Sequence, residues 1–176
     1  MTMPGLPVTL RLSGRPVILV GTGAAAQAKR RLLERAGAHV IAETDAWTGT
    51  GSEPPRIALV AVDDDAEAEA AVRRLRARGM LVNAVDRPAL SDFTIPALID
   101  RTPVLIAVST DGASAGLAAA LRQRMEAWLP ARLGALALAL RDARGTLRAR
   151  WPDGGARRRA ITTALAPGGP LDPLRE

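Results

Sequence analysis

The first half of the chain alternates short apolar runs with segments of helical period, and this alternation restricts the fold more than any other feature. Between the first two runs a helical pattern begins at about Ala25 and ends at Gly37. Another follows the third run, over 66–78, and ends at Gly79. Apolar strands separated by amphipathic helices predict an α/β fold with a Rossmann-like, doubly wound parallel sheet. The four expected strands are PVILV (16–20), HVIAE (39–43), IALVAV (57–62) and MLVNAV (80–85).

The ends of these strands predict where a ligand binds, because ligands of such sheets lie beyond the carboxyl ends of the strands. Gly21 follows the first strand, Asp63 the third and Asp86 the fourth. A carboxylate at the end of a buried run is costly unless it has a task, so Asp86 is the candidate reactive group. The alternative is an Asp that only caps the turn before Pro88, since Asp is common in turns.

A glycine-containing turn follows the first strand in the sequence VGTGAAA. Gly21 and Gly23 occupy the first two places of a G-x-G-x-x-G pattern, and Ala26 occupies the third. The first glycine allows a tight turn, and the second lets the backbone approach a pyrophosphate. The N–H groups at the start of the following helix, including those of Ala24 and Ala25, would hold the anion. The turn therefore predicts dinucleotide binding, with NAD as the cofactor.

Acidic residues follow the second strand, where a dinucleotide-binding domain places a carboxylate on the ribose hydroxyls. Glu43 and Asp45 lie about 20 residues beyond the glycines, as that arrangement requires. A carboxylate at this point favours NAD over NADP, because it repels a 2′-phosphate. The alternative is that both are solvated loop residues. Asp63, at the end of the third strand, is a further candidate for cofactor contact.

The second half has a different rhythm. Residues 93–110 contain two β-prone runs, as in a hairpin or a pair of exchanged strands, and 114–129 form an amphipathic helix that Pro130 ends. Further helices are expected over 131–150 and 155–166, followed by a frayed tail. Short Ala- and Leu-rich helices bury little alone, so a second subunit is expected to complete their core. The predicted regions are an NAD-binding domain (1–92), a dimerisation region (93–129) and a small helical C-terminal region (130–176).

The chain is basic, with a net charge of +6, and Lys29 is the only lysine among its 24 basic residues. Such a surface attracts polyanions, of which nucleic acid is the first expectation. Aromatic residues make up only 2% of the chain, however, and single-strand binders need aromatic stacking platforms. A small molecule with many carboxylates suits the same charge, and solvated surface arginines account for part of it. We therefore expect no nucleic-acid partner.

The chain contains no cysteine, which excludes disulfides and thiolate nucleophiles and fits a reducing cytoplasm. No apolar run approaches the roughly 20 residues of a membrane helix, and the start of the chain lacks the pattern of a signal peptide. With His39 as the only histidine, we expect no resident metal. These features predict a cytoplasmic protein with no membrane partner.

Several stretches resemble the precorrin-2 dehydrogenase / sirohydrochlorin ferrochelatase family, which includes the N-terminal part of fused siroheme synthases. The specific part is the block from Asn83 to Ser114. The link over 45–56 is short and lacks a helix that is usual in the family. The matching stretches are VILVGTGAAAQAKRRLLERAGAHV, VAVDDD, LVNAVDRPALSDFTIPALIDRTPVLIAVSTDGASAGLAAALRQRMEAWLP and GARRRA.

The resemblance implies oxidation of precorrin-2 to sirohydrochlorin with NAD on a homodimer and, in some members, insertion of ferrous iron to give siroheme. Asp86 falls on the aspartate implicated in catalysis. The nucleotide contacts fall on Gly21, Gly23, Ala24, Ala25, Asp45 and Ala46. Arginines are strong partners for the carboxylates of such a macrocycle. The expected substrate contacts are Asn83, Arg87, Thr110, Ser114 and Arg122.

Three classes of function therefore compete. In the first, an NAD-dependent enzyme, Asp86 accepts the proton that leaves the substrate while the cofactor takes the hydride. The second is a non-catalytic NAD-binding sensor that dimerises, which leaves Asp86 and the arginines unexplained. The third is a basic nucleic-acid-binding protein, which the shortage of stacking aromatics disfavours.

Overall fold

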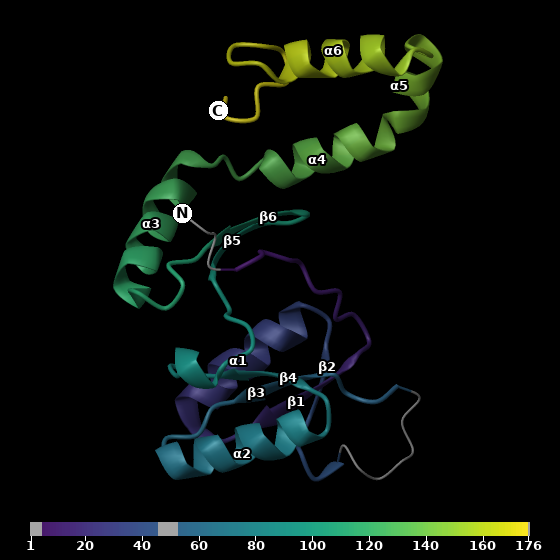
Figure 1. The fold of residues 1–176 in the computed structure, drawn as a ribbon. Helices are drawn as coiled ribbons and strands as arrows, with labels where there is room; N and C mark the ends of the chain where they lie inside the picture. Colours follow the sequence, from purple (N-terminus) through teal and green to yellow (C-terminus); the bar gives the residue numbers. More distant parts are fainter. Residues whose placement is uncertain (1–4, 46–52, 176) are drawn as a thin grey trace. The chain divides into compact units, whose positions relative to one another are not determined.

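The structure is a computed structural model, and it describes residues 5–45 and 53–175. The chain divides into two compact units, Met1–Ile95 and Pro96–Glu176 (Figure 1). Of the three regions expected from the sequence, 1–92 lies in the first unit and 130–176 lies in the second. The region 93–129 is divided between them.

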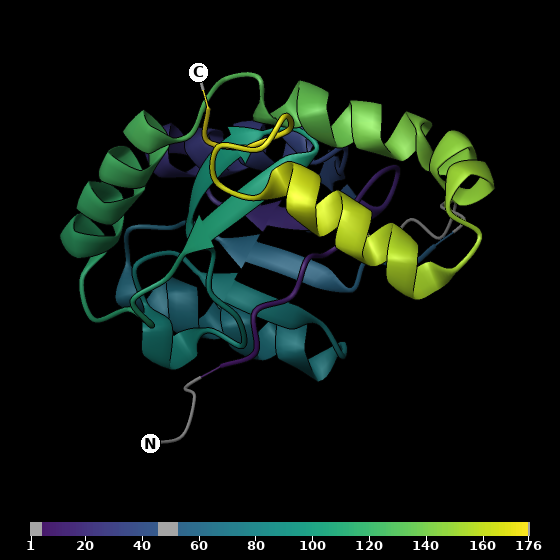
Figure 2. The same ribbon diagram turned by 90° about the horizontal axis from the view of Figure 1, so that it is seen from above.

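A four-stranded parallel sheet forms the centre of the first unit, as predicted. Its order is β2-β1-β3-β4, and Figure 2 shows the strands running in one direction. The chain moves outward from β1 to β2 and then returns to the other side of β1 for β3. The strand order thus changes direction between β1 and β3, which is where such sheets bind ligands. The strands are β1 (Pro16–Val20), β2 (His39–Ile41), β3 (Ile57–Val60) and β4 (Leu81–Ala84).

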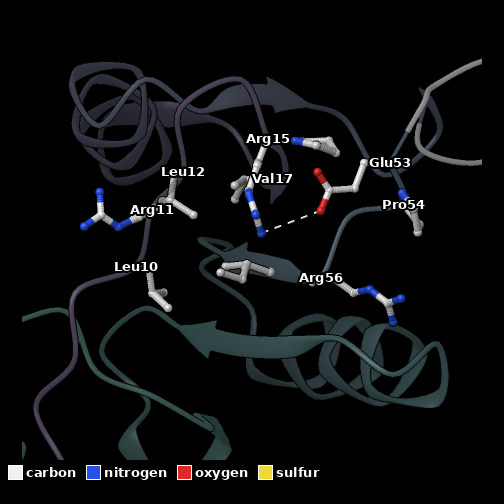
Figure 3. Close-up of a pocket in the computed structure, with 10 residues that line it drawn as sticks. Leu10, Arg11, Leu12, Arg15, Val17, Glu53, Pro54 and Arg56 are labelled. Atoms are coloured by element: carbon white, nitrogen blue, oxygen red, sulfur yellow. Dashed lines mark ion pairs between the residues drawn. The ribbon is translucent and has the colours of Figure 1, made fainter.

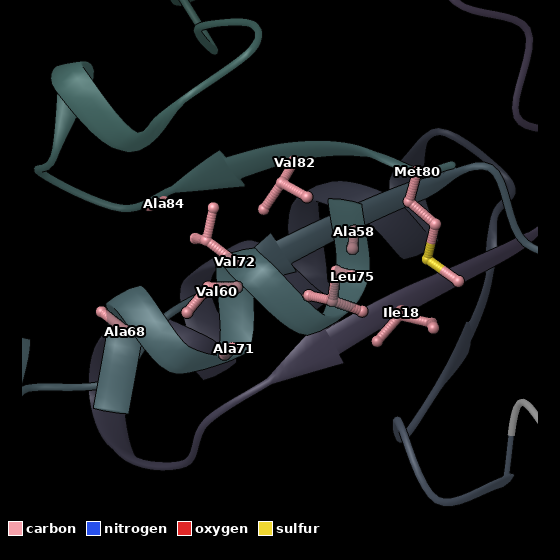
Figure 4. Close-up of a cluster of buried hydrophobic side chains, with 10 residues drawn as sticks. All are labelled: Ile18, Ala58, Val60, Ala68, Ala71, Val72, Leu75, Met80, Val82 and Ala84. Atoms are coloured by element: carbon pink, nitrogen blue, oxygen red, sulfur yellow. The ribbon is translucent and has the colours of Figure 1, made fainter. Parts of the chain in front are cut away.

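Helices α1 (Gly23–Arg35) and α2 (Asp65–Ala77) pack on opposite faces of the sheet. Ala26 and Leu33 of α1 are buried in a cluster with Val17, Leu19, Leu59 and Ala61. The cluster on the other face joins α2 to the strands through side chains that include Val72 and Leu75 (Figure 4). Neighbouring residues of one strand enter different clusters, which is the alternation expected of a sheet covered on both sides.

The outer edge of β4 is closed by the segment that follows the short 3-10 helix η2 (Pro88–Leu90). Asp92 donates its N–H to Val82 O at 2.7 Å, and its carboxylate accepts the Val82 N–H at 2.9 Å. The Ser91 hydroxyl similarly contacts Ala84 N and O, at 3.0 and 3.1 Å. Arg76 of α2 holds the Asp92 carboxylate, with Nη2 to Oδ1 at 2.7 Å.

The Asp92 contacts predict a pH-dependent stability. Burial by itself raises the pKa of this carboxyl, but the hydrogen bonds from Arg76 and Val82, with the Arg76 charge, outweigh it and lower the pKa below 3.8. A lowered folded-state pKa means that the ionised group stabilises the fold above its ordinary pKa, and that this contribution is lost as the pH falls through the folded value. Asp92→Asn should therefore cost about 1 kcal/mol of unfolding free energy at pH 7 and almost nothing at the lowest pH.

Urea unfolding between pH 7 and strongly acid pH measures this difference. Glu69→Gln is the control, because its ion pair with Arg73 is exposed and should contribute almost nothing. A destabilisation by Asp92→Asn that stayed constant down to the lowest pH would contradict the role of the charge.

The second unit begins with the predicted hairpin, whose strands β5 (Ala97–Arg101) and β6 (Val104–Val108) pair antiparallel. Helix α4 approaches the hairpin turn closely at Gly134, where an added Cβ would lie 2.2 Å from Thr102 O. Only a residue without a side chain permits this approach. The helices are α3 (Ala115–Trp128), α4 (Leu133–Asp142), α5 (Arg144–Arg150) and α6 (Gly154–Leu165).

Two expectations for the second unit are wrong. The single helix expected over 131–150 is broken at Ala143 into α4 and α5, and Gly145, a weak helix former, lies in the first turn of α5. The expected frayed tail is folded back, since Leu171 donates its N–H to Ala164 O at 2.9 Å. The Asp172 carboxylate orders this tail by accepting N–H groups of Gly168 and Leu174, which lower its pKa.

Candidate functional site

Gly21 and Gly23 form the turn at the carboxyl end of β1. Gly21 has φ +111°, and a Cβ there would lie 2.0 Å from Ala61 O, in the segment that follows β3. Gly23 has φ +83° and no atom within 4 Å of such a Cβ. Both need the backbone freedom of glycine, but only Gly23 faces open space. The first therefore lets two chain segments meet, and the second leaves room for a ligand beside the backbone.

The start of α1 is open toward this space. Thr22 precedes the helix in an extended conformation without a side-chain hydrogen bond to it, and the first turn carries no acidic residue. Ala24 and Ala25 are exposed, whereas Ala26 is 3% exposed and packs against the sheet. Free N–H groups and the helix dipole favour an anion at this point. The turn therefore fits the pyrophosphate of a dinucleotide.

Helix α2 starts at the same edge of the sheet, yet its N-terminus already has an acidic cap. Asp64 accepts the N–H of Glu67 at 2.7 Å. Of the three consecutive aspartates 63–65, it is therefore the one that caps α2. Asp65 and Glu67 add negative charge to its first turn. The two helices thus differ at this edge: α1 is suited to an anion and α2 is not. Asp63 precedes the cap with an exposed side chain.

Asp86 lies in a turn at the carboxyl end of β4. The turn is closed by Arg87 N–H to Ala84 O at 3.1 Å, and Asp86 has φ +59° at its third position. Glycine or asparagine is usual there, so an Asp at this position is strained. The residue is exposed. Because β1, β3 and β4 are parallel, this carboxylate lies at the same edge of the sheet as the glycine turn.

Two predicted substrate residues beside Asp86 are occupied by contacts within the chain. Asn83 is buried, and its side-chain N–H donates to Phe93 O at 2.8 Å. The Arg87 guanidinium donates to Val62 O at 3.0 Å and to Asp63 O at 2.8 Å. Their roles toward a substrate stay predictions.

Of the residues predicted near the ribose, Glu43 is not brought to the glycine turn. Strand β2 ends opposite Ile18, before β1 ends, and Glu43 pairs with Arg74 at 3.0 Å and Arg78 at 3.4 Å. These arginines lie in or just after the last turn of α2, which runs toward the amino edge of the sheet. The Glu43 hydrogen bond is the largest cause of a raised Arg74 pKa. Asp45 is exposed, and Ala46 lies outside the described residues.

The remaining predicted substrate residues belong to the second unit. Thr110 Oγ1 accepts the Ser114 N–H at 3.2 Å, and Ser114 Oγ caps α3 by accepting Leu117 N–H at 3.1 Å. Arg122 pairs with Glu126, one turn further along α3. The spacing of Arg122 and Glu126 predicts their pair, since residues four apart are neighbours on a helix. Glu126 also accepts from Arg101 Nη1 at 3.3 Å, a contact between distant residues that no spacing rule predicts.

A hollow of about 150 Å³ lies at the opposite, amino edge of the sheet (Figure 3). Val17 and Ile57 line it, and Arg15 pairs across it with Glu53 at 3.6 Å. Because the hollow lies at the starts of β1 and β3, it is separate from the glycine turn and Asp86.

Among residues 5–45 and 53–175, no His, Cys, Asp or Glu side chains form a group of three that could hold a metal ion. No helix in this described part has the length and apolar character of a membrane span.

Comparison with known proteins gives consistent matches. A family model for NAD(P)-binding matches residues 45–97. The siroheme synthase of Methylococcus capsulatus is 40% identical and that of Methylobacillus flagellatus 36%, each over 89% of this chain. The chain spans 37% and 38% of the length of these two relatives. A solved structure of SirC, a precorrin-2 dehydrogenase, superposes with a TM-score of 0.64 at 22% identity, covering 93% of this chain and 90% of that one. This likeness confirms the predicted fold.

Proposed function

Because the chain belongs to the precorrin-2 dehydrogenase family, as a counterpart of the N-terminal part of siroheme synthases, we propose that it oxidises precorrin-2 to sirohydrochlorin with NAD. The observation that carries this proposal is the meeting of two features at one edge of the sheet. These are an open, glycine-containing helix start suited to a pyrophosphate and a strained, exposed carboxylate at the end of β4.

The reaction removes a hydride and a proton from the substrate. NAD, when bound, supplies the hydride acceptor. The backbone of Gly21 and Gly23 and the N–H groups of Ala24 and Ala25 would hold the pyrophosphate. Asp86 then accepts the proton that leaves the macrocycle, and releases it to solvent between turnovers because the residue is exposed.

The substrate role of the second unit follows from its charge and its loop. Arg122 can exchange Glu126 for a substrate carboxylate, and Thr110 and Ser114 present hydroxyl groups before α3. Charge-assisted bonds from a guanidinium to carboxylates are strong and directional. Asn83, Asp63, Asp45 and Ala46 keep their predicted contacts as parts of this proposal, whereas Glu43 is held by Arg74 and Arg78 and is left out of it. Ferrous iron, in a following chelation, would be a substrate and not a resident metal.

The second unit is proposed to form a homodimer. Among residues 96–175, only Ile99, Ala118 and Gly134 are buried, so the unit has little interior of its own. Helix α3 presents Leu117, Leu121 and Trp128 on one stripe, with exposures of 53%, 41% and 73%. A second copy covering this stripe would complete the interior.

Leu117→Asp should convert a dimer into a monomer, because it places a charge in the proposed apolar interface. Light scattering at micromolar concentration measures the molar mass. Leu174→Asp is the matched control, since Leu174 is 60% exposed in the C-terminal segment and should leave the mass unchanged. A wild-type chain that is already monomeric would contradict the dimer.

The function is tested by mixing the chain with NAD and enzymatically generated precorrin-2. Equimolar appearance of NADH and of the absorption of sirohydrochlorin is expected. Binding of NAD without NADH formation would favour the sensor over the enzyme. Ferrous iron added to the same cuvette separates chelation from oxidation. A cytoplasmic location stays a prediction.

A further inference from the structure

The guanidinium of Arg87 joins the two chain segments that flank the candidate site. It donates to Val62 O and Asp63 O, the carbonyl groups beyond β3, and Nη1 lies 3.4 Å from Val85 O beyond β4. Its Nε donates to Asp65 Oδ1 at 2.8 Å, and Nη2 lies 2.7 Å from the same oxygen. The Arg87 side chain is only 20% exposed. One side chain therefore connects the ends of two neighbouring strands and the start of α2.

These contacts use most of the hydrogen-bonding capacity of the group. A guanidinium has five N–H donors in a fixed plane, and here it makes four hydrogen bonds and an ion pair from Nη2 to Asp65 Oδ1. A bidentate bond to a substrate carboxylate would therefore require some of these bonds to break. The contacts thus favour a role in building the site over a role in binding the substrate.

The residue next to this arrangement in the chain is Asp86. It directly precedes Arg87, and its strained φ of +59° must be maintained by the surrounding structure. The backbone bond from Arg87 N–H to Ala84 O closes the turn, and the side-chain bonds fix the same residue to the segment after β3. We propose that Arg87 is a positioning residue, which holds the turn 84–87 against β3 and so aims the Asp86 carboxylate at the reacting substrate. This role rests on the proposed function of Asp86.

Arg87→Gln tests the proposal, with Arg76→Gln as the matched control. Arg76 makes a comparable set of bonds, to Asp92 and Leu90 O, but at the outer edge of β4. Arg87→Gln should lower kcat by about tenfold or more with little change in the Kd for NADH, because only the alignment of the reacting group is lost. Arg76→Gln should leave kcat within about twofold even when its loss of stability is equal.

A double-variant cycle separates positioning from general destabilisation. If Arg87 acts through Asp86, Arg87→Gln should have almost no further effect on the residual turnover of Asp86→Asn. An effect of undiminished size in that background would overturn the proposal, as would equal losses of kcat in Arg87→Gln and Arg76→Gln.

Hydrogen exchange keeps this inference distinct from the proposed function. Amide exchange of the peptide covering 84–88 should accelerate in Arg87→Gln and not in Arg76→Gln. If the wild-type chain does not oxidise precorrin-2, the proposed function fails. Unchanged amide exchange of 84–88 in Arg87→Gln would separately overturn the proposal that Arg87 holds this turn.

Discussion

Asp86→Asn should lower the turnover of precorrin-2 by about 10²- to 10⁴-fold, the range expected when a positioned proton acceptor is lost. Asn has almost the same shape and tolerates a positive φ well, so the turn at the end of β4 keeps its conformation. The Kd for NADH and the midpoint of urea unfolding should both stay near their wild-type values. Stopped-flow measurement of NADH formation gives kcat, and titration of NADH fluorescence gives the Kd.

Asp86→Gly separates the chemical role of this residue from its structural one. Glycine relieves the strain of φ +59°, so this variant should be at least as stable as the wild type while remaining inactive. A residue that only capped the turn would behave differently, since its loss would reduce stability and leave turnover intact. Normal turnover in both variants would rule out Asp86 as the proton acceptor.

Gly23→Ala should weaken NAD binding by about 2 kcal/mol, or roughly 30-fold in Kd, with a smaller effect on folding. Its added methyl group meets no protein atom within 4 Å, and enters the space where the pyrophosphate would approach the backbone. The positive φ adds a folding cost of about 1–2 kcal/mol, because the residue is no longer glycine. NADH fluorescence and urea unfolding measure the two effects separately.

Gly21→Ala is the contrasting variant. Its methyl group would lie 2.0 Å from Ala61 O. This carbonyl oxygen belongs to the backbone directly after β3, so it cannot easily move away. We expect a loss of more than about 3 kcal/mol of stability, so that folding fails before binding can be measured. Similar stability losses in the two glycine variants, with unchanged NADH binding by Gly23→Ala, would contradict the assignment of this turn.

Local pattern predicted most of the first unit correctly. The apolar runs became strands of one parallel sheet, and the residues expected after β1, β3 and β4 lie at one edge because parallel strands place their carboxyl ends together. The position of Asp86 follows from this rule. Its strained φ does not, since a turn conformation depends on the contacts that enforce it.

The contacts between distant residues could not be read from the sequence. Glu43 pairs with arginines of α2 because β2 ends early, opposite Ile18, and no spacing rule contains that information. The four acceptor oxygens around the guanidinium of Arg87 belong to residues 62–65, after β3 and at the start of α2, and to Val85 after β4. The folded tail depends on Asp172, whose short-range bonds to backbone N–H groups convert a Gly- and Pro-rich sequence into ordered turns.

The covering of β4 by Ser91 and Asp92 has a consequence for self-association. The outward backbone groups of Val82 and Ala84 are already hydrogen-bonded, so this margin cannot recruit a strand from a neighbouring molecule. At the other margin, β2 is only three residues long and offers a poor template for strand addition. The sheet is thereby protected against growth into fibrils, and the proposed dimer would use the second unit instead.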